Sequence, residues 1–279
     1  MRRIVSAVVC GTVLWAGAAL AQKAPAAKKA AVKKAVAAKP VKEPKFGMQV
    51  KNDDVIFYTQ GNFYIVQAES INSGGNMLYF AAKDFTSGKD LIVKKMQKNE
   101  VRVDGPDRKV VKTTFLLGDA NGVDKAYSLD LFTEVRKAMP FLATYTKFYY
   151  NGQETHSCGI NWGVSCAYAK NKYKYYTLPK EGKVQTFKLG GEGDKKIGQA
   201  KWLYAHDGKG SGAGLICPAV ILGKGEDFVF VNSVPPQKEL APGQSMDAFI
   251  IFMPIAKPIN FKVLNTLYSQ IANISWKFE

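Results

Sequence analysis

The chain has 279 residues, 47% of them hydrophobic, and a formal net charge of +16 at pH 7. The charge is unevenly divided: residues 1–46 carry +9, and the remaining 233 residues carry +7. The longer part is therefore moderately basic, without a single block of like charge, which is ordinary for a soluble domain. It is long enough to form one large domain or two small ones.

The N-terminus has the features of a cleavable export signal. Met1-Arg2-Arg3 is a basic region, residues 4–20 are predominantly apolar, and Ala19-Leu20-Ala21 supplies the small residues that a signal peptidase requires. The apolar run is short for a membrane span. We expect residues 1–21 to be removed, leaving a periplasmic or secreted protein without a transmembrane segment. Retention as an N-terminal anchor is the alternative.

Residues 22–46 form a low-complexity stretch rich in Ala, Lys and Pro. The stretch has almost no apolar side chain larger than Val, so burial cannot offset its conformational entropy, and we expect a solvated tether. Lysine-rich arms can bind nucleic acid through its phosphates. Export separates this chain from chromosomal DNA, so we expect no nucleic-acid partner, and contact with anionic envelope polymers is the alternative to a simple tether.

The remainder, residues 47–279, is predicted to be mainly β. Runs of β-branched and aromatic residues alternate with Gly, Asn and Asp turns at the short spacing of a sandwich or barrel. Residues 55–59 and 63–68 flank a Gly/Asn break and predict a hairpin, and residues 72–76 predict the next turn.

One segment interrupts the β pattern. The apolar residues between Ser128 and Met139 recur at helical spacing, Ser128 occupies the N-cap position, and Pro140 would end the helix. We expect one short helix here, with a strand over residues 127–131 as the alternative.

Residues 148–210 are the most polar and aromatic part of the body, and we interpret them as an insertion or second β-rich lobe. Tyrosine combines an apolar ring with a hydrogen-bonding tip, which suits sugar rings and protein interfaces, and neighbouring lysines favour anionic partners. The candidate binding residues are Lys170, Lys172, Tyr173, Lys174, Tyr175 and Tyr176. A tyrosine-rich edge strand whose lysines prevent aggregation is the alternative.

Three cysteines follow the export signal, Cys158, Cys166 and Cys217. An oxidising compartment permits disulfides. Cys158 and Cys166 bracket a segment that we interpret as a loop with two glycines, and closing it would remove unfolded-state entropy worth roughly 2.5 kcal/mol. We predict a Cys158–Cys166 disulfide, with one cysteine of the three left unpaired.

The C-terminal part predicts the most deeply buried strand. Pro242-Gly243 has turn chemistry, and the apolar run from Ala248 to Met253, stopped by Pro254, predicts a strand buried on both faces. Residues 261–264 and 274–278 predict further strands.

A resemblance accompanies this stretch. Leu240-Ala241-Pro242-Gly243-Gln244-Ser245, the apolar strand and Phe261-Lys262-Val263 resemble the closing strands of bacterial extracytoplasmic Ig-like (telokin-like) domains of unknown function. The resemblance covers residues 240–263 and implies an Ig-like antiparallel β-sandwich. It assigns no functional residue.

The sequence contains few groups of residues that would suit a catalytic, metal-binding or phosphate-binding site. The chain has two histidines, so a cysteine hydrolase would most simply pair His156 with Cys158, which would share a strand face. Zinc-like spacing is absent, and we expect no metal and no cofactor. The glycine-rich segment 208–214 lacks the Lys-Ser/Thr ending of a phosphate loop.

These observations predict an exported, non-catalytic β-sandwich that acts as a binding or scaffolding module of the bacterial cell envelope. Its partner would be an anionic envelope polymer, such as an anionic glycan, or an envelope protein. The alternative is an envelope hydrolase acting on glycan or peptide, using His156 and Cys158 or an unrecognised pair of acids.

The export signal leads to a direct test. The mature protein is expected to begin at Gln22, because signal peptidase cleaves after Ala-Leu-Ala. N-terminal sequencing of protein from a periplasmic extract or culture supernatant measures this, and recovery of the intact Met1 form from the soluble cytoplasm would contradict it.

Overall fold

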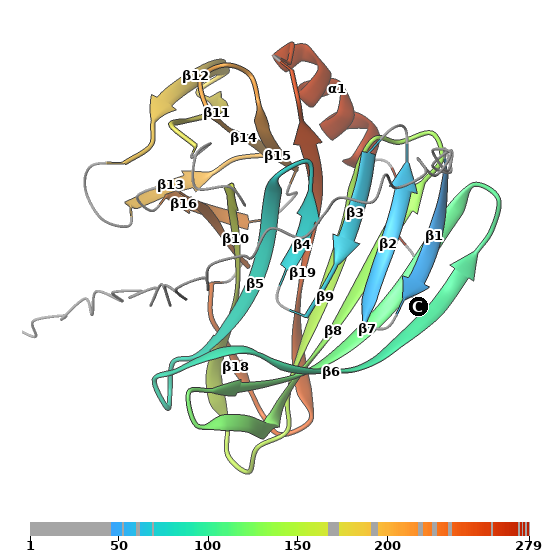
Figure 1. Cartoon of the computed structure of the whole chain (residues 1–279). Coiled ribbons are helices and arrows are strands. Elements are labelled where there is room, and N and C mark those ends of the chain that lie inside the picture. The colour runs from blue at the N-terminus through green and yellow to red at the C-terminus, as the bar shows by residue number, and fades with distance from the viewer. Residues whose placement is uncertain are drawn as a thin grey trace, which may run out of the picture. The chain divides into compact units, whose positions relative to one another are not determined.

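The structure is a computed structural model of the chain (Figure 1). It describes residues 46–51, 53–59, 62–68, 70–166, 173–190, 195–216, 220–224, 228–233, 236–257, 259–272, 274, 276 and 278, which belong to one compact unit. The predicted signal peptide and all of the predicted tether except Phe46 lie outside the described residues. Among the described residues, no helix has the length and apolar character needed to cross a membrane.

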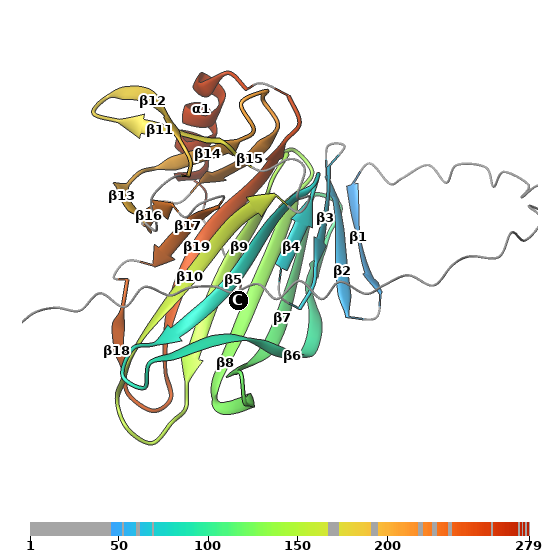
Figure 2. The same ribbon diagram turned by 60° about the vertical axis from the view of Figure 1, so that its left-hand side comes forward.

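The fold consists of two layers of antiparallel strands, which can be followed in Figures 1 and 2. The first layer contains β1 (Phe46–Lys51), β2 (Asp54–Thr59), β3 (Asn62–Val66), β4 (Ser70–Ser73), β5 (Asn76–Asp84), β10 (His156–Cys166), β17 (Val229–Ser233), β16 (Val220–Lys224) and β13 (Lys195–Gln199) in this order, with β18 (Lys238–Leu240) also paired to β10.

The second layer contains β6 (Lys89–Asp104), β7 (Arg108–Asp119), β8 (Gly122–Arg136), β9 (Leu142–Tyr150), β19 (Gln244–Ile255), β15 (Gly212–Ile216), β14 (Trp202–His206), β11 (Tyr175–Lys180) and β12 (Lys183–Lys188) in this order.

Strand β6 joins the two layers. Its first residues, Lys89–Leu91, pair with β5 in the first layer, and from Ile92 onward the strand pairs with β7 in the second. The apolar side chains that point inward from both layers form one core, because alternate residues of each strand face the same side. In β5, for example, Leu78, Phe80 and Ala82 are buried in this core.

The outer face of the second layer carries its own apolar cover. Helix α1 (Phe261–Ala272) lies beside β14 in both views, and its Leu264 and Ile271 are buried against this face. Further along, Phe278 stacks on Tyr145 of β9, with ring centroids 5.3 Å apart. The C-terminal segment therefore seals one outer face of the sandwich.

Several sequence predictions are confirmed. The fold is an antiparallel β-sandwich with a short helix, β2 and β3 form the expected hairpin, and Gly74-Gly75 form the expected turn with positive φ at both positions. At Pro242-Gly243 the chain also turns, since the Gln244 N–H donates to the Ala241 carbonyl. The apolar run then forms β19, buried on both faces around Ile250–Met253.

Three element predictions are wrong. Residues 128–136 continue β8 instead of forming a helix, because this strand is buried on both faces and so lacks the simple alternation of a strand. Residues 261–264 begin α1 instead of a strand, so this part of the Ig-like resemblance corresponds to a helix. The described residues of the last predicted strand, 274, 276 and 278, have no strand structure.

The proposed insertion at residues 148–210 is not a separate sheet. Its first strands, the end of β9 and all of β10, pair with β8, β19 and β5 near the centre of the two layers. Strands β11, β12 and β14 lie toward the far end of the second layer. The boundaries of an insertion remain a prediction.

Glycine is required where two strands approach closely. A methyl group on Gly212 would lie 2.0 Å from the carbonyl oxygen of Ala205 in the paired strand, and this backbone atom cannot move aside. Gly212→Ala is expected to lower the free energy of unfolding by at least about 2 kcal/mol. Gly105→Ala is the matched control, because the nearest atom is 3.5 Å away. Denaturant unfolding measures both variants, and equal stabilities would contradict the prediction.

Candidate functional site

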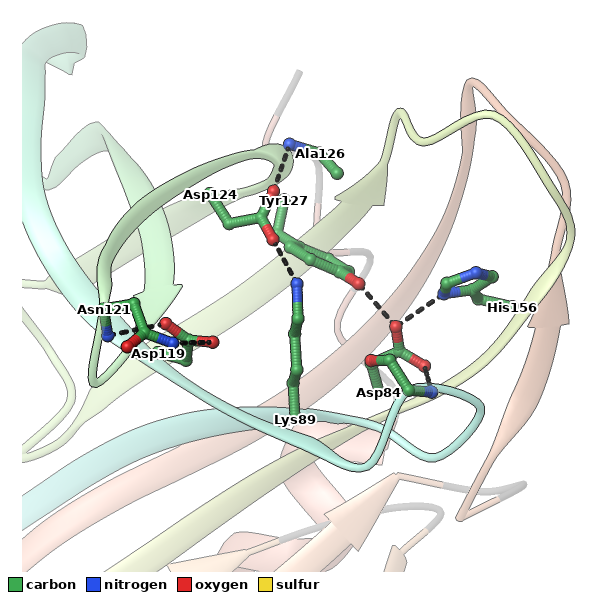
Figure 3. A network of polar contacts seen from close by, with 9 residues as sticks. Asp84, Lys89, Asp119, Asn121, Asp124, Ala126, Tyr127 and His156 are labelled. Carbon is green, nitrogen blue, oxygen red and sulfur yellow. Dashed lines mark hydrogen bonds and ion pairs between the residues drawn. The ribbon is translucent and has the colours of Figure 1, made fainter.

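A buried carboxylate connects the two layers at one end of the core. Asp84, the last inward-facing residue of β5, accepts hydrogen bonds from the Tyr127 hydroxyl of β8 and from Nδ1 of His156 of β10 at 2.6 Å. Its other oxygen accepts the backbone N–H groups of Thr86 and Ser87 at 2.9 and 3.1 Å. Figure 3 shows Tyr127 and His156 converging on Asp84. We call Asp84, Tyr127 and His156 the interlayer clamp.

The clamp contains an ionised carboxylate. Burial disfavours the charge on Asp84, but the hydrogen bonds from Tyr127, Ser87 and His156 outweigh it and lower the pKa to about 2. An ionised carboxylate only accepts hydrogen bonds, so Nδ1 of His156 carries the proton, and Nε2 points away from Asp84 (Figure 3). Burial raises the pKa of Tyr127, which therefore stays a donor.

The clamp extends outward through Lys89. Its ammonium group donates to Asp124 at 2.7 Å and lies over the Tyr127 ring, 5.9 Å from the centroid. On the other side, the His156 ring stacks on Tyr150 of β9, with centroids 4.8 Å apart. A hydrogen-bonded Asp–His pair can orient an imidazole for acid–base chemistry, but here both partners also hold the two layers together.

Cys158 lies beside the clamp, with its side chain in the core. It faces inward from β10, opposite Asp84 in the register, and is fully buried. Burial and the nearby Asp84 raise the pKa of its thiol to about 12, so the thiol stays protonated near neutral pH. This raised pKa does not favour the thiolate that a dyad of His156 with Cys158 would require.

The predicted disulfide is also wrong. Cys158 and Cys166 lie in the same continuous strand, β10, instead of flanking a loop. Eight residues of extended strand separate their Cα atoms by about 26 Å, whereas a disulfide requires less than about 7 Å. Cys217 lies outside the described residues.

The predicted Lys/Tyr surface is divided by the fold. Lys170 and Lys172 lie outside the described residues. Tyr173 is 4% exposed, and its hydroxyl donates to Asn76 at 2.7 Å; Tyr176 is 7% exposed and stacks on Phe187. Two of the proposed binding aromatics are therefore largely buried.

The remaining members of this surface are Lys174 and Tyr175. Lys174 is exposed, and Tyr175 is half-buried against the ring of His206, with centroids 5.6 Å apart. Burial lowers the pKa of His206, which accepts the Gly208 N–H at Nδ1 and contacts the Thr177 hydroxyl through Nε2. This histidine is part of the local packing. The described residues contain no group of His, Cys, Asp and Glu side chains that suits a metal ion.

A second arrangement lies on the outward side of the first layer, where sequence reasoning found nothing. The inward residues of β10 are Cys158, Ile160, Trp162 and Val164, so Gly159, Asn161 and Gly163 face outward. The Tyr79 ring of β5 lies across Gly163, because a methyl group built there would be 2.0 Å from its Cζ. Gly163 thus makes room for an aromatic ring.

A second ring lies beside the other glycine. A methyl group built on Gly159 would be 2.4 Å from the carbonyl oxygen of Pro236 and 3.0 Å from the Phe85 ring, which remains 43% exposed. Asn161 lies between the two glycines, is half-buried, and makes no side-chain hydrogen bond to another described residue. On the other side of β10, the half-buried Phe230 pairs with Gly163. We call Tyr79, Phe85, Asn161 and Phe230 the β10 outer face.

A sequence signal for this face existed. Gly159 and Gly163 are four residues apart, which places them on one face of a strand, and interior glycines in strands often mark a close approach by another group. We instead interpreted the two glycines as loop residues.

Comparison with known proteins supports the fold. No known family model and no curated protein matches this sequence. Among solved structures, the GH36 α-galactosidase AgaB from Geobacillus stearothermophilus is similar over 76% of this chain and 41% of its own, with a TM-score of 0.52 and 11% identity. At this identity the likeness shows the fold alone.

Two other solved structures are similar at lower scores. They are the α-N-acetylgalactosaminidase NagBb from Bifidobacterium bifidum (TM-score 0.48, 10% identity, 81% of this chain and 38% of that one) and a mutant of the heparan sulfate lyase HepC from Pedobacter heparinus (TM-score 0.48, 8% identity, 78% and 38%). This chain spans less than half the length of each of these three proteins.

The clamp predicts an acid-sensitive contribution to stability. The folded pKa of Asp84 lies below the ordinary value of 3.8, so the stabilisation is present above about pH 4 and is lost as the pH falls toward 2. Its size is roughly 2 kcal/mol. Asp84→Asn should lower the free energy of unfolding at pH 7 by at least that amount and flatten its dependence on pH between 4 and 2.

Asp90→Asn is the matched control for this change. Asp90 is half-exposed on the same hairpin and pairs with Lys83 at 3.1 Å, so its loss should cost less than about 1 kcal/mol. Urea unfolding followed at several pH values measures both variants. An Asp84→Asn protein with unchanged stability at pH 7 would show that the clamp does not hold the layers.

Proposed function

We propose that this chain is an exported, non-catalytic module of the cell envelope that binds a glycan on the β10 outer face. The observation that carries the proposal is the pair of aromatic rings, Tyr79 over Gly163 and the exposed Phe85 beside Gly159, with Asn161 between the two glycines. Sugars are bound by aromatic surfaces together with a small number of precisely placed polar groups, and this face supplies both.

The kind of fold supports a glycan as the ligand. One solved structure that shares the fold, at a TM-score of 0.52, is the GH36 α-galactosidase AgaB. That likeness extends over less than half of that protein, so it supports a glycan-related module and does not assign an activity.

The chemistry of the clamp supports a non-catalytic role. Asp84 is fully buried with both oxygens occupied, and the Cys158 thiol is protonated. A cysteine hydrolase would use His156 as the base and Cys158 as the nucleophile. These observations do not support that role for the two residues.

Export and tethering belong to the same proposal. The basic N-terminal region, the apolar run and the Ala/Lys/Pro stretch suit a folded domain held at a distance from its attachment, within reach of envelope polymers. Contact with anionic polymers is assigned to the lysine-rich tail, because Tyr173 and Tyr176 of the Lys/Tyr stretch are buried.

Phe85→Ala is expected to weaken binding to isolated envelope glycans at least tenfold, because it removes an exposed ring from the β10 outer face. Phe63→Ala is the matched control: Phe63 is 42% exposed and faces outward from β3, at a distance from β10. Pull-down with purified envelope material and calorimetry measure the two affinities.

Both variants should melt near the wild-type temperature, since neither ring is buried in the core. Equal losses for the two variants would indicate non-specific apolar adsorption and would contradict the proposed face. Release of soluble sugars or peptides from the same material by the wild-type protein would instead favour the hydrolase.

A further inference from the structure

The β10 outer face is nearly uncharged, although the folded body carries a net charge of +7. Among the described side chains that point outward from β5, β10 and β17, Lys83 is the charged one. Its ammonium group is paired with Asp90 at 3.1 Å and lies 6.0 Å from the centre of the Phe85 ring. On β18, the exposed Glu239 is paired with the outward-facing Ser157 of β10, so Lys83, Asp90 and Glu239 together carry a net charge of −1.

The other groups on this face are neutral and of two kinds. Tyr79, Phe85 and Phe230 supply aromatic surface, and Asn161 supplies one amide with both donors and an acceptor. Aromatic rings stack on the C–H faces of sugar rings, and an amide can bond two neighbouring hydroxyls at once. An anionic ligand would find no unpaired cation among these described residues, so charge would not favour it here.

The two rings are also spaced along the strand. Tyr79 lies over Gly163 and Phe85 lies beside Gly159, and these glycines are four residues apart, which corresponds to about 13 Å along β10. That separation is longer than one sugar ring, and Asn161 occupies the interval between the two positions. The arrangement suits a short run of linked sugars lying along the strand better than a single monosaccharide.

We propose that the ligand of the β10 outer face is a neutral, unbranched glycan, contacted by Phe85 and Tyr79 and hydrogen-bonded by Asn161. This inference rests on the proposed glycan-binding function and narrows it from glycans in general to uncharged chains. The anionic polymers expected from the overall charge are left to the N-terminal tail.

The test compares matched oligosaccharides on the mature full-length protein. Calorimetry measures binding of neutral β-1,4-linked hexamers of glucose, xylose, mannose and N-acetylglucosamine, and of the glucuronate hexamer that corresponds to the glucose chain. At least one neutral hexamer is expected to bind, with an affinity that changes less than twofold between 50 and 500 mM salt. The glucuronate chain should bind at least tenfold more weakly than the glucose chain does, if glucose is the sugar bound.

Two variants separate the contacts. Asn161→Ala should weaken binding of the neutral hexamer at least tenfold, because the amide is lost without disturbing either ring. Lys83→Gln should change it less than twofold, since the ammonium group is already paired with Asp90. Thermal melting of both variants checks that the fold is kept.

The outcomes distinguish the two levels of the proposal. Binding confined to the glucuronate chain, steeply weakened by salt and lost in Lys83→Gln, would overturn the neutral ligand and leave glycan binding standing. Binding of neutral hexamers that survives both Asn161→Ala and Phe85→Ala would place the sugar elsewhere and overturn the inference. Failure of every oligosaccharide and of envelope glycans would overturn the proposed function itself.

Discussion

The buried carboxylate of Asp84 is the contact on which the arrangement of the two layers depends. It is an ionised group without access to solvent, so every donor that water would have supplied must come from the protein. These donors come from β8 in one layer, β10 in the other, and the backbone of the turn after β5. Loss of any one leaves a buried charge with fewer partners, which couples three distant parts of the chain.

The same residue sets the position of the β10 outer face. Asp84 is followed directly by Phe85, whose N–H donates to the Ser157 carbonyl of β10 at 2.8 Å. The turn that surrounds the carboxylate therefore also fixes the ring beside Gly159. Immediately afterwards the chain enters β6 and crosses to the other layer. Two adjacent residues thus act on opposite sides of the sandwich: the polar Asp84 on the inside and the aromatic Phe85 on the outside.

Much of the fold could be predicted from runs of β-branched and aromatic residues between turns. β2 and β3 were predicted in this way as a hairpin, whereas β8 places Leu131 in the main core and Phe132 under the C-terminal segment, so both faces are apolar. A strand that is buried on both faces lacks the alternation of apolar and polar residues that marks an ordinary strand. The spacing of Leu131, Phe132 and Val135 then matches that of a helix. In α1, the short segment Phe261-Lys262-Val263 alternates as a strand would. The packing of Leu264 and Ile271 stabilises a helix there instead.

The candidate site was harder to predict because it depends on glycines, which have no side chain to mark its position. Glycines in β10 gave a loop interpretation and a disulfide, while in the fold Gly163 accommodates the Tyr79 ring and Gly159 the Pro236 carbonyl and the edge of Phe85. No single-sequence pattern links Gly163 to Tyr79, which lies 84 positions earlier in the chain. The clustered Tyr and Lys residues looked like a surface, yet the fold turns Tyr173 and Tyr176 inward, where their rings serve packing.

Burial of Cys158 has a kinetic consequence for the folding of this chain. The thiol becomes inert only after β10 has paired with β5, which brings together Cys158 and Asp84 across 74 positions of sequence. Contacts of such long range form slowly, because the intervening chain must first be ordered. Until then the thiol has the ordinary acidity of an exposed cysteine and can exchange with other thiols. The fold thus protects the native protein from mispairing, and the chain that is still folding is protected only by the speed with which β10 pairs with β5.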